Sequence, residues 1–238
     1  LSMRNFVYKV IGIPNHFYEK EKLISRRSKI IKLIKSGLNL KEETIFMTLI
    51  SRPDDNTFCN SKDRENYLKN IGSFLSKNNK WHLLIKAHPK EAAYTKEGWA
   101  SLLGLSINQN NFSITKKSSL ELAAISEFGF SFVSTCCIDF ACFNKPMIEL
   151  TSLHRTKFRN KTTFFSPNGI PLTAEAFHNL TINIKSIKEL KAFLDELENN
   201  IKKYSKLVRL GYKNSYGMKT YIPGSFKNLV HNIPKTKI

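Results

Sequence analysis

Short apolar runs alternate with helix-like patterns along most of the chain. The helix-like patterns predict helices at 63–77, 119–126 and 137–143, the first with apolar residues at helical spacing. Between them lie apolar runs typical of buried strands, at 44–50, 81–86, 112–115, 130–133 and 147–150. Strands and helices in turn imply right-handed crossovers. We therefore expect an α/β fold: a Rossmann-like, mainly parallel sheet with helices on both faces.

The amino-terminal part differs from this alternating region. It holds a short apolar piece at 7–13, which we expect to be a strand leading into the domain, and a basic helix-like stretch at 19–35. We therefore separate residues 1–40, a linker with that strand and a basic helix, from a Rossmann-like domain at 41–238.

The carboxyl-terminal part contains one long amphipathic pattern. Ser186 and Glu189 have the spacing of a capping box, in which each side chain bonds to the backbone N–H of the other residue. From Ile187 to Tyr204 apolar residues step by three and four, and the pattern ends near Gly211. These features predict a long C-terminal helix whose apolar stripe packs on the core.

The chain is strongly basic. Its 238 residues include 38 Lys and Arg against 19 Asp and Glu, a formal net charge of +19. Such an excess favours anionic partners: nucleic acid, phosphate-bearing small molecules or the surface of an anionic membrane. The basic residues are spread along the chain without a long run, so a basic tail is not expected. Many of them could equally be ordinary solvated surface.

The cysteines point to a reducing compartment. None of the four stands in a C-x-x-C pair, and the adjacent Cys136 and Cys137 suit neither an ordinary disulfide nor a zinc site. We expect reduced thiols in a cytoplasmic protein without metal. No apolar stretch approaches the roughly 20 residues that cross a bilayer, and no secretory signal opens the sequence. Peripheral association with the inner face of the membrane is an alternative that the charge leaves open.

Polar and basic residues follow three of the predicted strands. Arg52 comes after the first strand, His88 comes after the second between Lys86 and Lys90, and Ser134-Thr135 follows the run at 130–133. In an open parallel sheet, ligands bind at the carboxyl ends of the strands. An imidazole, a guanidinium, ammonium groups and hydroxyls gathered there suit an anion with several oxygens, such as a phosphate.

The segment after Thr135 predicts the start of a helix. Its first N–H groups would be unpaired and could donate to a phosphate, with Cys136 and Cys137 as small residues that let the backbone approach. A reactive thiol is the less favoured alternative, because no base stands next to it in the sequence. Asp139, one turn on, is either an acceptor for a ribose or sugar hydroxyl or an ordinary first-turn acid.

Four pieces of the sequence resemble a known family: 85–89 (IKAHP), 122–126 (LAAIS), 133–148 and 10–14 (VIGIP). They are similar to the carboxy-terminal, donor-nucleotide-binding half of GT-B glycosyltransferases. More narrowly, they resemble the bacterial surface-polysaccharide group, which comprises CDP-glycerol glycerophosphotransferases, polysialyltransferases and capsule Kdo transferases. The likeness covers roughly residues 8–210. The chain departs from it at Cys136 and Cys137, at or next to which the family commonly has two serines.

The resemblance implies a role for each candidate residue. His88, as the catalytic residue, and the Ser134-Thr135 turn would hold the phosphate of a CMP-, CDP- or UDP-linked sugar or polyol. They would stabilise the departing phosphate without a metal or other cofactor. Residues 41–238 would then be the nucleotide-sugar-binding domain of a transferase that builds a surface polysaccharide.

The resemblance also implies that a part is missing. Such enzymes carry an amino-terminal domain with the acceptor site and usually the catalytic base, and nothing in this chain is long enough to be that domain. A glycan or lipid-linked acceptor would then need a partner chain or a second copy in a homo-oligomer, and nucleic acid is not the expected partner.

Two other functions stay open. A UDP-sugar 2-epimerase relative shares the architecture but would need several carboxylates around the sugar, for which Asp139, Glu149 and Glu121 are the candidates. A non-catalytic basic module would bind nucleic acid or anionic lipid through its charge, and it predicts lysines clustered on one face and binding that falls steeply with salt.

Overall fold

The computed structural model describes residues 14–53, 58–91, 94–152 and 164–216. Within them lies a six-stranded sheet in the order β3-β2-β1-β4-β5-β8, and every neighbouring pair in it is parallel. This confirms the α/β prediction. The strands are β1 (Ile45–Ile50), β2 (Trp81–Lys86), β3 (Phe112–Ile114), β4 (Phe128–Ser131), β5 (Met147–Leu150) and β8 (Ile182–Ile184).

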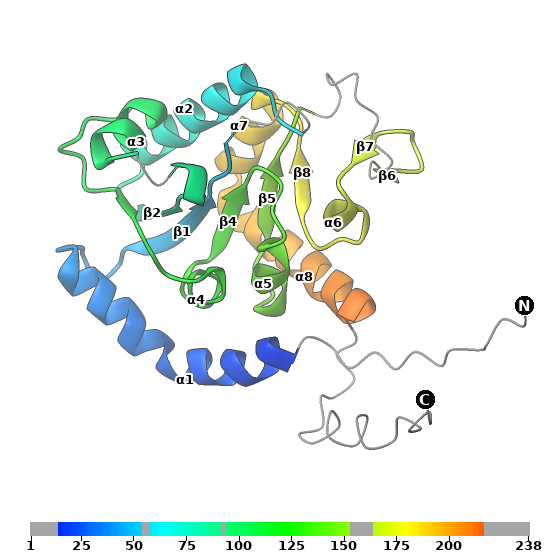
Figure 1. Cartoon of the computed structure of the whole chain (residues 1–238), viewed down its shortest axis with the longest axis horizontal. Helices are drawn as coiled ribbons and strands as arrows, with labels where there is room; N and C mark the ends of the chain where they lie inside the picture. The colour runs from blue at the N-terminus through cyan, green and yellow to red at the C-terminus, as the bar shows by residue number, and fades with distance from the viewer. Residues whose placement is uncertain (1–13, 54–57, 92–93, 153–163, 217–238) are drawn as a thin grey trace, which may run out of the picture.

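Helices cover both faces of the sheet (Figure 1). On one face α2 (Ser61–Lys77) packs against α3 (Lys96–Leu103) and α7 (Ile187–Asp195). On the other face α1 (Pro14–Gly37), α4 (Ser119–Ile125) and α5 (Cys137–Cys142) lie side by side. The long α8 (Leu197–Tyr216) joins both layers, because its start packs into the α2 side of the core and its end packs on α5.

Gly72 sets the close approach of α2 and α3. A Cβ at this position would lie 1.9 Å from the carbonyl oxygen of Leu103, so only glycine fits there. The core on this side also holds the fully buried Tyr67, Leu68 and Trp99. The sequence analysis had assigned no helix to residues 96–103, where α3 lies.

The predicted strands match the observed ones closely, with one exception. The strand expected at 130–133 lies at Phe128–Ser131 instead. Phe128 and Phe130 are both fully buried, and β4 pairs with Met47 to Ile50 of β1. The chain leaves the sheet before Val133, which has a φ of 58° and therefore cannot continue a strand.

The C-terminal helix was expected to be continuous but is divided in two. The break falls at Glu196, whose φ and ψ of −112° and 35° are not helical. Asn200 compensates for it, because its side-chain amide donates to the carbonyl oxygen of Phe193 over 3.0 Å. The bend lets Phe193 and Leu197 both enter the core. The predicted end at Gly211 was also wrong, since α8 runs on to Tyr216 and Gly211 serves close packing against the carbonyls of residues 178 and 179.

The capping box expected at Ser186 is only half formed. Its hydroxyl accepts from the N–H of Glu189 over 3.2 Å, but the Glu189 carboxylate bonds to the N–H of Lys185. A complete capping box instead starts α4, between Ser118 and Glu121.

Helix α1 contains the basic stretch predicted at 19–35 and is tied to the domain by its cations. Arg27 donates to the carbonyl oxygen of Ala124 and to the carboxylate of Glu127, each over 2.8 Å. The strand expected at 7–13 lies outside the described residues. Among the described helices, none is both long and apolar enough to pass through a membrane.

The stretch between β5 and α7 has short elements that the sequence analysis did not predict. A two-stranded antiparallel ribbon of β6 (Phe164–Phe165) and β7 (Pro171–Leu172) leads into α6 (Ala174–Phe177), and β8 follows. β8 is the edge strand of the sheet next to β5, and β6, β7 and α6 stand beyond it (Figure 1).

Candidate functional site

A cleft of about 700 Å³ opens at the carboxyl ends of β1, β2 and β4. The strand order reverses between β1 and β4, where β1 leads on to β2 and β3 while β4 leads on to β5 and β8. Crevices at such a switch point are the usual ligand sites of open parallel sheets. The cleft is lined by residues 50–52, 86–89, 133–136 and 173–175, together with Phe58.

Most of the predicted site residues meet in this cleft. Arg52, Lys86, His88, Ser134, Thr135 and Cys136 all line it. Lys90, Cys137 and Asp139 are not among the lining residues. The side chain of Lys90 is exposed to solvent beyond His88, and Asp139 accepts a hydrogen bond from the hydroxyl of Ser119 on α4.

The two cations of the cleft and its imidazole are held by backbone groups. Arg52 donates to the carbonyl oxygen of Val133 over 3.2 Å, and Lys86 donates to that of Lys117 over 3.0 Å. His88 Nδ1 accepts from the N–H of Lys90 over 3.2 Å. Because Nδ1 is the acceptor, Nε2 is the ring nitrogen that carries the proton of the neutral imidazole and can donate it to a ligand.

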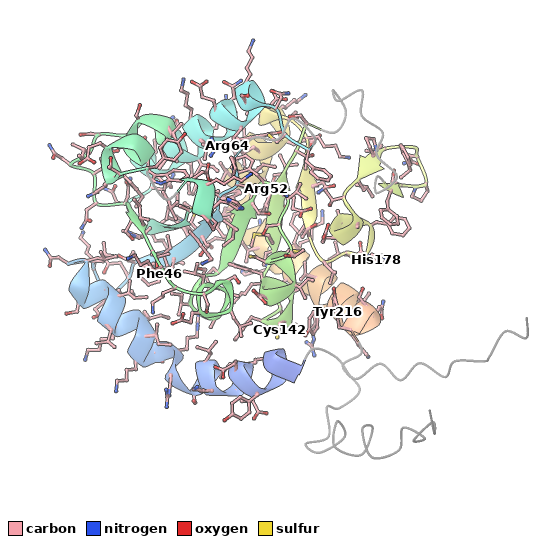
Figure 2. The ribbon with its side chains drawn as sticks, in the orientation of Figure 1. Phe46, Arg52, Arg64, Cys142, His178 and Tyr216 are labelled. Atoms are coloured by element: carbon pink, nitrogen blue, oxygen red, sulfur yellow. The ribbon has the colours of Figure 1, made fainter. Side chains whose placement is uncertain are left out.

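A buried ion pair, which was not predicted from the sequence, supports the cleft. Arg64 of α2 pairs with Glu91, and its guanidinium also donates to Ser51 Oγ and to the carbonyl oxygen of Arg52. Arg64 and Arg52 lie together over the central strand ends (Figure 2). The Arg64 guanidinium stacks on the ring of Phe132 at 5.3 Å, so one side chain joins the segments that follow β1, β2 and β4.

The turn from Val133 to Cys136 has a strained backbone, and its carbonyl groups accept hydrogen bonds from the N–H groups that follow. Val133 has a φ of 58°, a rare conformation for a β-branched residue that costs about 1–3 kcal/mol. The N–H groups of Cys137 and Ile138 donate to the carbonyl oxygens of Ser134 and Thr135, each over 3.1 Å. The expectation of unpaired N–H groups there was therefore wrong. The donors that this turn can offer a ligand are the hydroxyls of Ser134 and Thr135.

The two adjacent thiols have different surroundings. Cys136 is half-buried at the edge of the cleft, whereas Cys137 is fully buried against α4 and β1. Burial raises the pKa of the Cys137 thiol well above its ordinary value, and the nearby carboxylates of Glu149 and Glu175 raise it further. The Cys137 thiol is thus held in its neutral form, which is a poor nucleophile.

The far wall of the cleft is supported by a buried acid. Thr173, Ala174 and Glu175 line the cleft at the start of α6. Thr173 Oγ1 donates over 2.5 Å to Glu149 of β5, whose side chain is fully buried. A glutamate inside an apolar strand was the available sequence signal for this contact. Within the described part of the chain, no group of three or more His, Cys, Asp or Glu is arranged to hold a metal ion.

Comparisons of the sequence and the structure with known proteins give different results. No protein-family model matches the sequence, and no curated protein is significantly similar to it. Solved structures do match. The wall teichoic acid polymerase TagF aligns with a TM-score of 0.60 and 15% identity, over 94% of this chain and 51% of TagF.

Two further matches are sugar-nucleotide proteins. The UDP-GlcNAc 2-epimerase of Neisseria meningitidis, solved with UDP-GlcNAc, has a TM-score of 0.58 at 12% identity over 91% of this chain and 52% of its own. MnaA of S. aureus, solved with UDP, has a TM-score of 0.54 at 14% identity over 83% of this chain and 46% of MnaA. This chain spans about half the length of each, and the likeness shows that it has the fold of a GT-B half domain.

Proposed function

We propose that this chain is the donor-binding half of a transferase that uses a nucleotide-activated sugar or polyol phosphate to build a surface polysaccharide. The observation that carries the proposal is the cleft at the strand switch point, which brings Arg52, Lys86 and His88 together with the hydroxyls of the Ser134-Thr135 turn. The matched structures, which include a polymer-forming enzyme and proteins solved with UDP or UDP-GlcNAc, support it.

The cleft residues fit the diphosphate of such a donor. A guanidinium carries five N–H donors and an ammonium three, so Arg52 and Lys86 can bond to both a carbonyl oxygen and a phosphate. His88 would donate from Nε2 to the oxygen on which negative charge builds up when the donor bond breaks. The strained Val133 fixes the turn that presents the two hydroxyls. No metal or other cofactor is part of this proposal.

The remainder of the reaction would depend on another part. This chain spans about half of the matched proteins, so we place the acceptor site and the catalytic base in a second domain, supplied by a longer chain, a partner or a second copy. A glycan or lipid-linked acceptor would bring the protein to the inner face of the membrane from the cytoplasm.

The 2-epimerase alternative is less favoured. Among the described residues that line the cleft, Glu175 is the one carboxylate. Glu149 is buried beneath the wall, and Asp139 and Glu121 bond to Ser119 and Ser118 outside the cleft. An enzyme that moves a proton on the sugar ring needs acid and base groups in contact with it.

Nucleotide binding tests the proposal. We expect CMP, CDP or UDP at millimolar concentration to raise the melting temperature, and His88→Ala to weaken the binding by tenfold or more, roughly the loss of one charge-assisted hydrogen bond. His178→Ala is the matched control, because this exposed histidine lies outside the cleft lining (Figure 2). If none of the three nucleotides shifts the melting temperature, the proposal is wrong. Binding that is not saturable and falls steeply with salt would instead favour a basic module.

A further inference from the structure

Glu149 lies directly beneath the cleft and binds its hydrogen-bond partners with only one oxygen. Oε2 accepts from Thr173 Oγ1 over 2.5 Å, from Thr181 Oγ1 over 2.9 Å and from Asn183 Nδ2 over 3.0 Å. Oε1 is also buried, and it has no hydrogen-bond partner among the described residues. This asymmetry marks Oε1 as the atom on which a proton would sit, since all three donors are already used by Oε2.

A second buried polar atom stands on the neighbouring strand. Ser131 of β4 is the register partner of Glu149, so both side chains leave the same face of the sheet. Ser131 is fully buried, and its Oγ likewise has no partner among the described residues. Asn183 of β8 is the register partner of Glu149 on the other side. The three residues form a polar row across β4, β5 and β8, in which Ser131 and Glu149 are fully buried.

The row is connected to the cleft in two ways, along the chain from Ser131 and through the hydrogen bond between Thr173 and Glu149. Ser131 is the last residue of β4, and the turn that lines the cleft begins two residues later at Val133. Thr173, which donates to Glu149, itself lines the cleft, and its Oγ1 also caps α6 by accepting from the N–H of Ala176 over 3.2 Å. One hydrogen bond therefore joins Glu149 to a residue that lines the cleft.

No cation among the described residues balances the charge of Glu149. The charged group that acts on it is Glu175 of α6, which disfavours a second negative charge nearby, while the neighbouring thiol of Cys137 on α5 is neutral. Its other neighbours, Thr173, Thr181 and Asn183, are neutral donors. Burial is the largest effect and raises the pKa of Glu149 to about 7, so both protonation states occur near neutral pH.

We propose that Glu149 is a positioning residue that couples donor binding to proton uptake: an anionic ligand in the cleft favours the protonated acid, and the proton is placed on Oε1, the carboxyl oxygen that the three donors leave unused. The proposal rests on the proposed function, because it needs an anionic ligand in the cleft. A diphosphate adds negative charge near an acid that has no counter-ion among the described residues, and this makes the ionised form of Glu149 less stable. By reciprocity, the ligand binds more tightly to the protonated protein, so its affinity falls as the pH rises through 7.

Calorimetric titration with UDP-N-acetylglucosamine and CDP-glycerol tests this coupling. Both are diphosphate diesters without a phosphate group that titrates near pH 7, so the ligand adds no proton linkage of its own. Titrations at pH 7.5 in two buffers of different ionisation enthalpy give the number of protons taken up. We expect the wild-type protein to take up a fraction of a proton and to lose about tenfold in affinity between pH 6 and pH 8.5, as for a shift of one pKa unit.

Glu149→Gln isolates the contribution of this carboxyl group to the pH dependence. The amide cannot ionise, so the variant should take up fewer protons than the wild type and show a flatter pH profile. If a ligand binds and the two profiles coincide, the coupling is refuted while the proposed function stands. If neither ligand binds the wild-type protein at any pH, both fall together.

A measurement on the unmodified protein guards against a variant that does not fold. Carbon-13 NMR of glutamate carboxyl groups should show one glutamate that titrates near neutral pH and whose midpoint rises when the ligand is added. The resonance is assigned by its loss in Glu149→Gln or, if that variant is unfolded, by a change of its midpoint in Thr173→Val. If no glutamate carboxyl titrates between pH 6 and pH 8, the inference is overturned.

Discussion

Replacing Arg64 by Met tests the ion pair that supports the cleft. Methionine keeps much of the side-chain volume but removes the charge, so Glu91 is left in the core, 3% exposed and without its counter-ion. The bonds from the guanidinium to Ser51 Oγ and to the carbonyl oxygen of Arg52 are lost as well. We expect a large loss of stability from this single change.

The magnitude follows from burial. Removing one partner of a buried pair typically destabilises a protein by about 3–5 kcal/mol, because the remaining charge stays desolvated. The free energy of unfolding of a folded domain is about 5–15 kcal/mol, so Arg64→Met would remove a large part of it. The pair Lys69–Glu65 on the same helix is the matched control. Both of its side chains are about half exposed, and Lys69→Met should cost at most about 1 kcal/mol.

Urea unfolding followed by far-ultraviolet circular dichroism measures both variants. A double-mutant cycle with Glu91→Gln isolates the pair, and the double variant should lose about 1–3 kcal/mol less than the sum of the two single changes. The reasoning is refuted if Arg64→Met costs no more than Lys69→Met, or if the single changes are additive.

Two further predictions concern His82 and the cysteines. Burial lowers the pKa of His82 to about 4 from an unfolded value of 6.5, so the unfolded chain binds the proton first and stability falls as the pH drops from 6.5 to 4. The raised pKa of the buried Glu149 adds stability over the same pH range in both proteins, so the effect of His82 is the difference between them. In urea unfolding at pH 7.5 and 4.5, the wild type should lose about 3 kcal/mol relative to His82→Asn, and an equal pH dependence in both would contradict the assignment. Iodoacetamide should label the half-buried Cys136 in the native protein, while the buried Cys59, Cys137 and Cys142 should react only in urea. Mass spectrometry measures the labelling, and a Cys137 that is labelled as fast as Cys136 would show that its thiol is accessible.

Continuous apolar strands were the most predictable part of the fold. The runs at 81–86 and 147–150 coincide with β2 and β5, because strands buried on both faces of a parallel sheet are mainly apolar, even with His82 inside β2 and Glu149 inside β5. The aromatic run around β4 was placed two residues too late, because apolar residues continue from Phe128 to Val133 and nothing in the sequence marks where the backbone turns.

The strand ends predicted which residues would share the cleft, but not how they are held there. Arg64 and Glu91 occupy positions that a sequence assigns to the surface, and only the packing of α2 over β1 brings them together. The hydrogen bonds inside the turn after Val133 also depend on tertiary geometry. The break at Glu196 has the same origin, because helical spacing continues across it in the sequence.

The sheet joins two halves at one seam, where β1 pairs with β4, and the hydroxyl groups of Thr48 and Ser126 meet there at 2.7 Å. Arg52, Lys86 and His88 belong to the half built by β1 to β3, whereas Ser134, Thr135 and Glu175 belong to the half built by β4 to β8. A ligand bound by both groups of residues would link the two halves of the sheet, because β1 and β4 could not separate without releasing it. Its binding energy would then protect the central backbone amides from hydrogen exchange more than those of the outer strands.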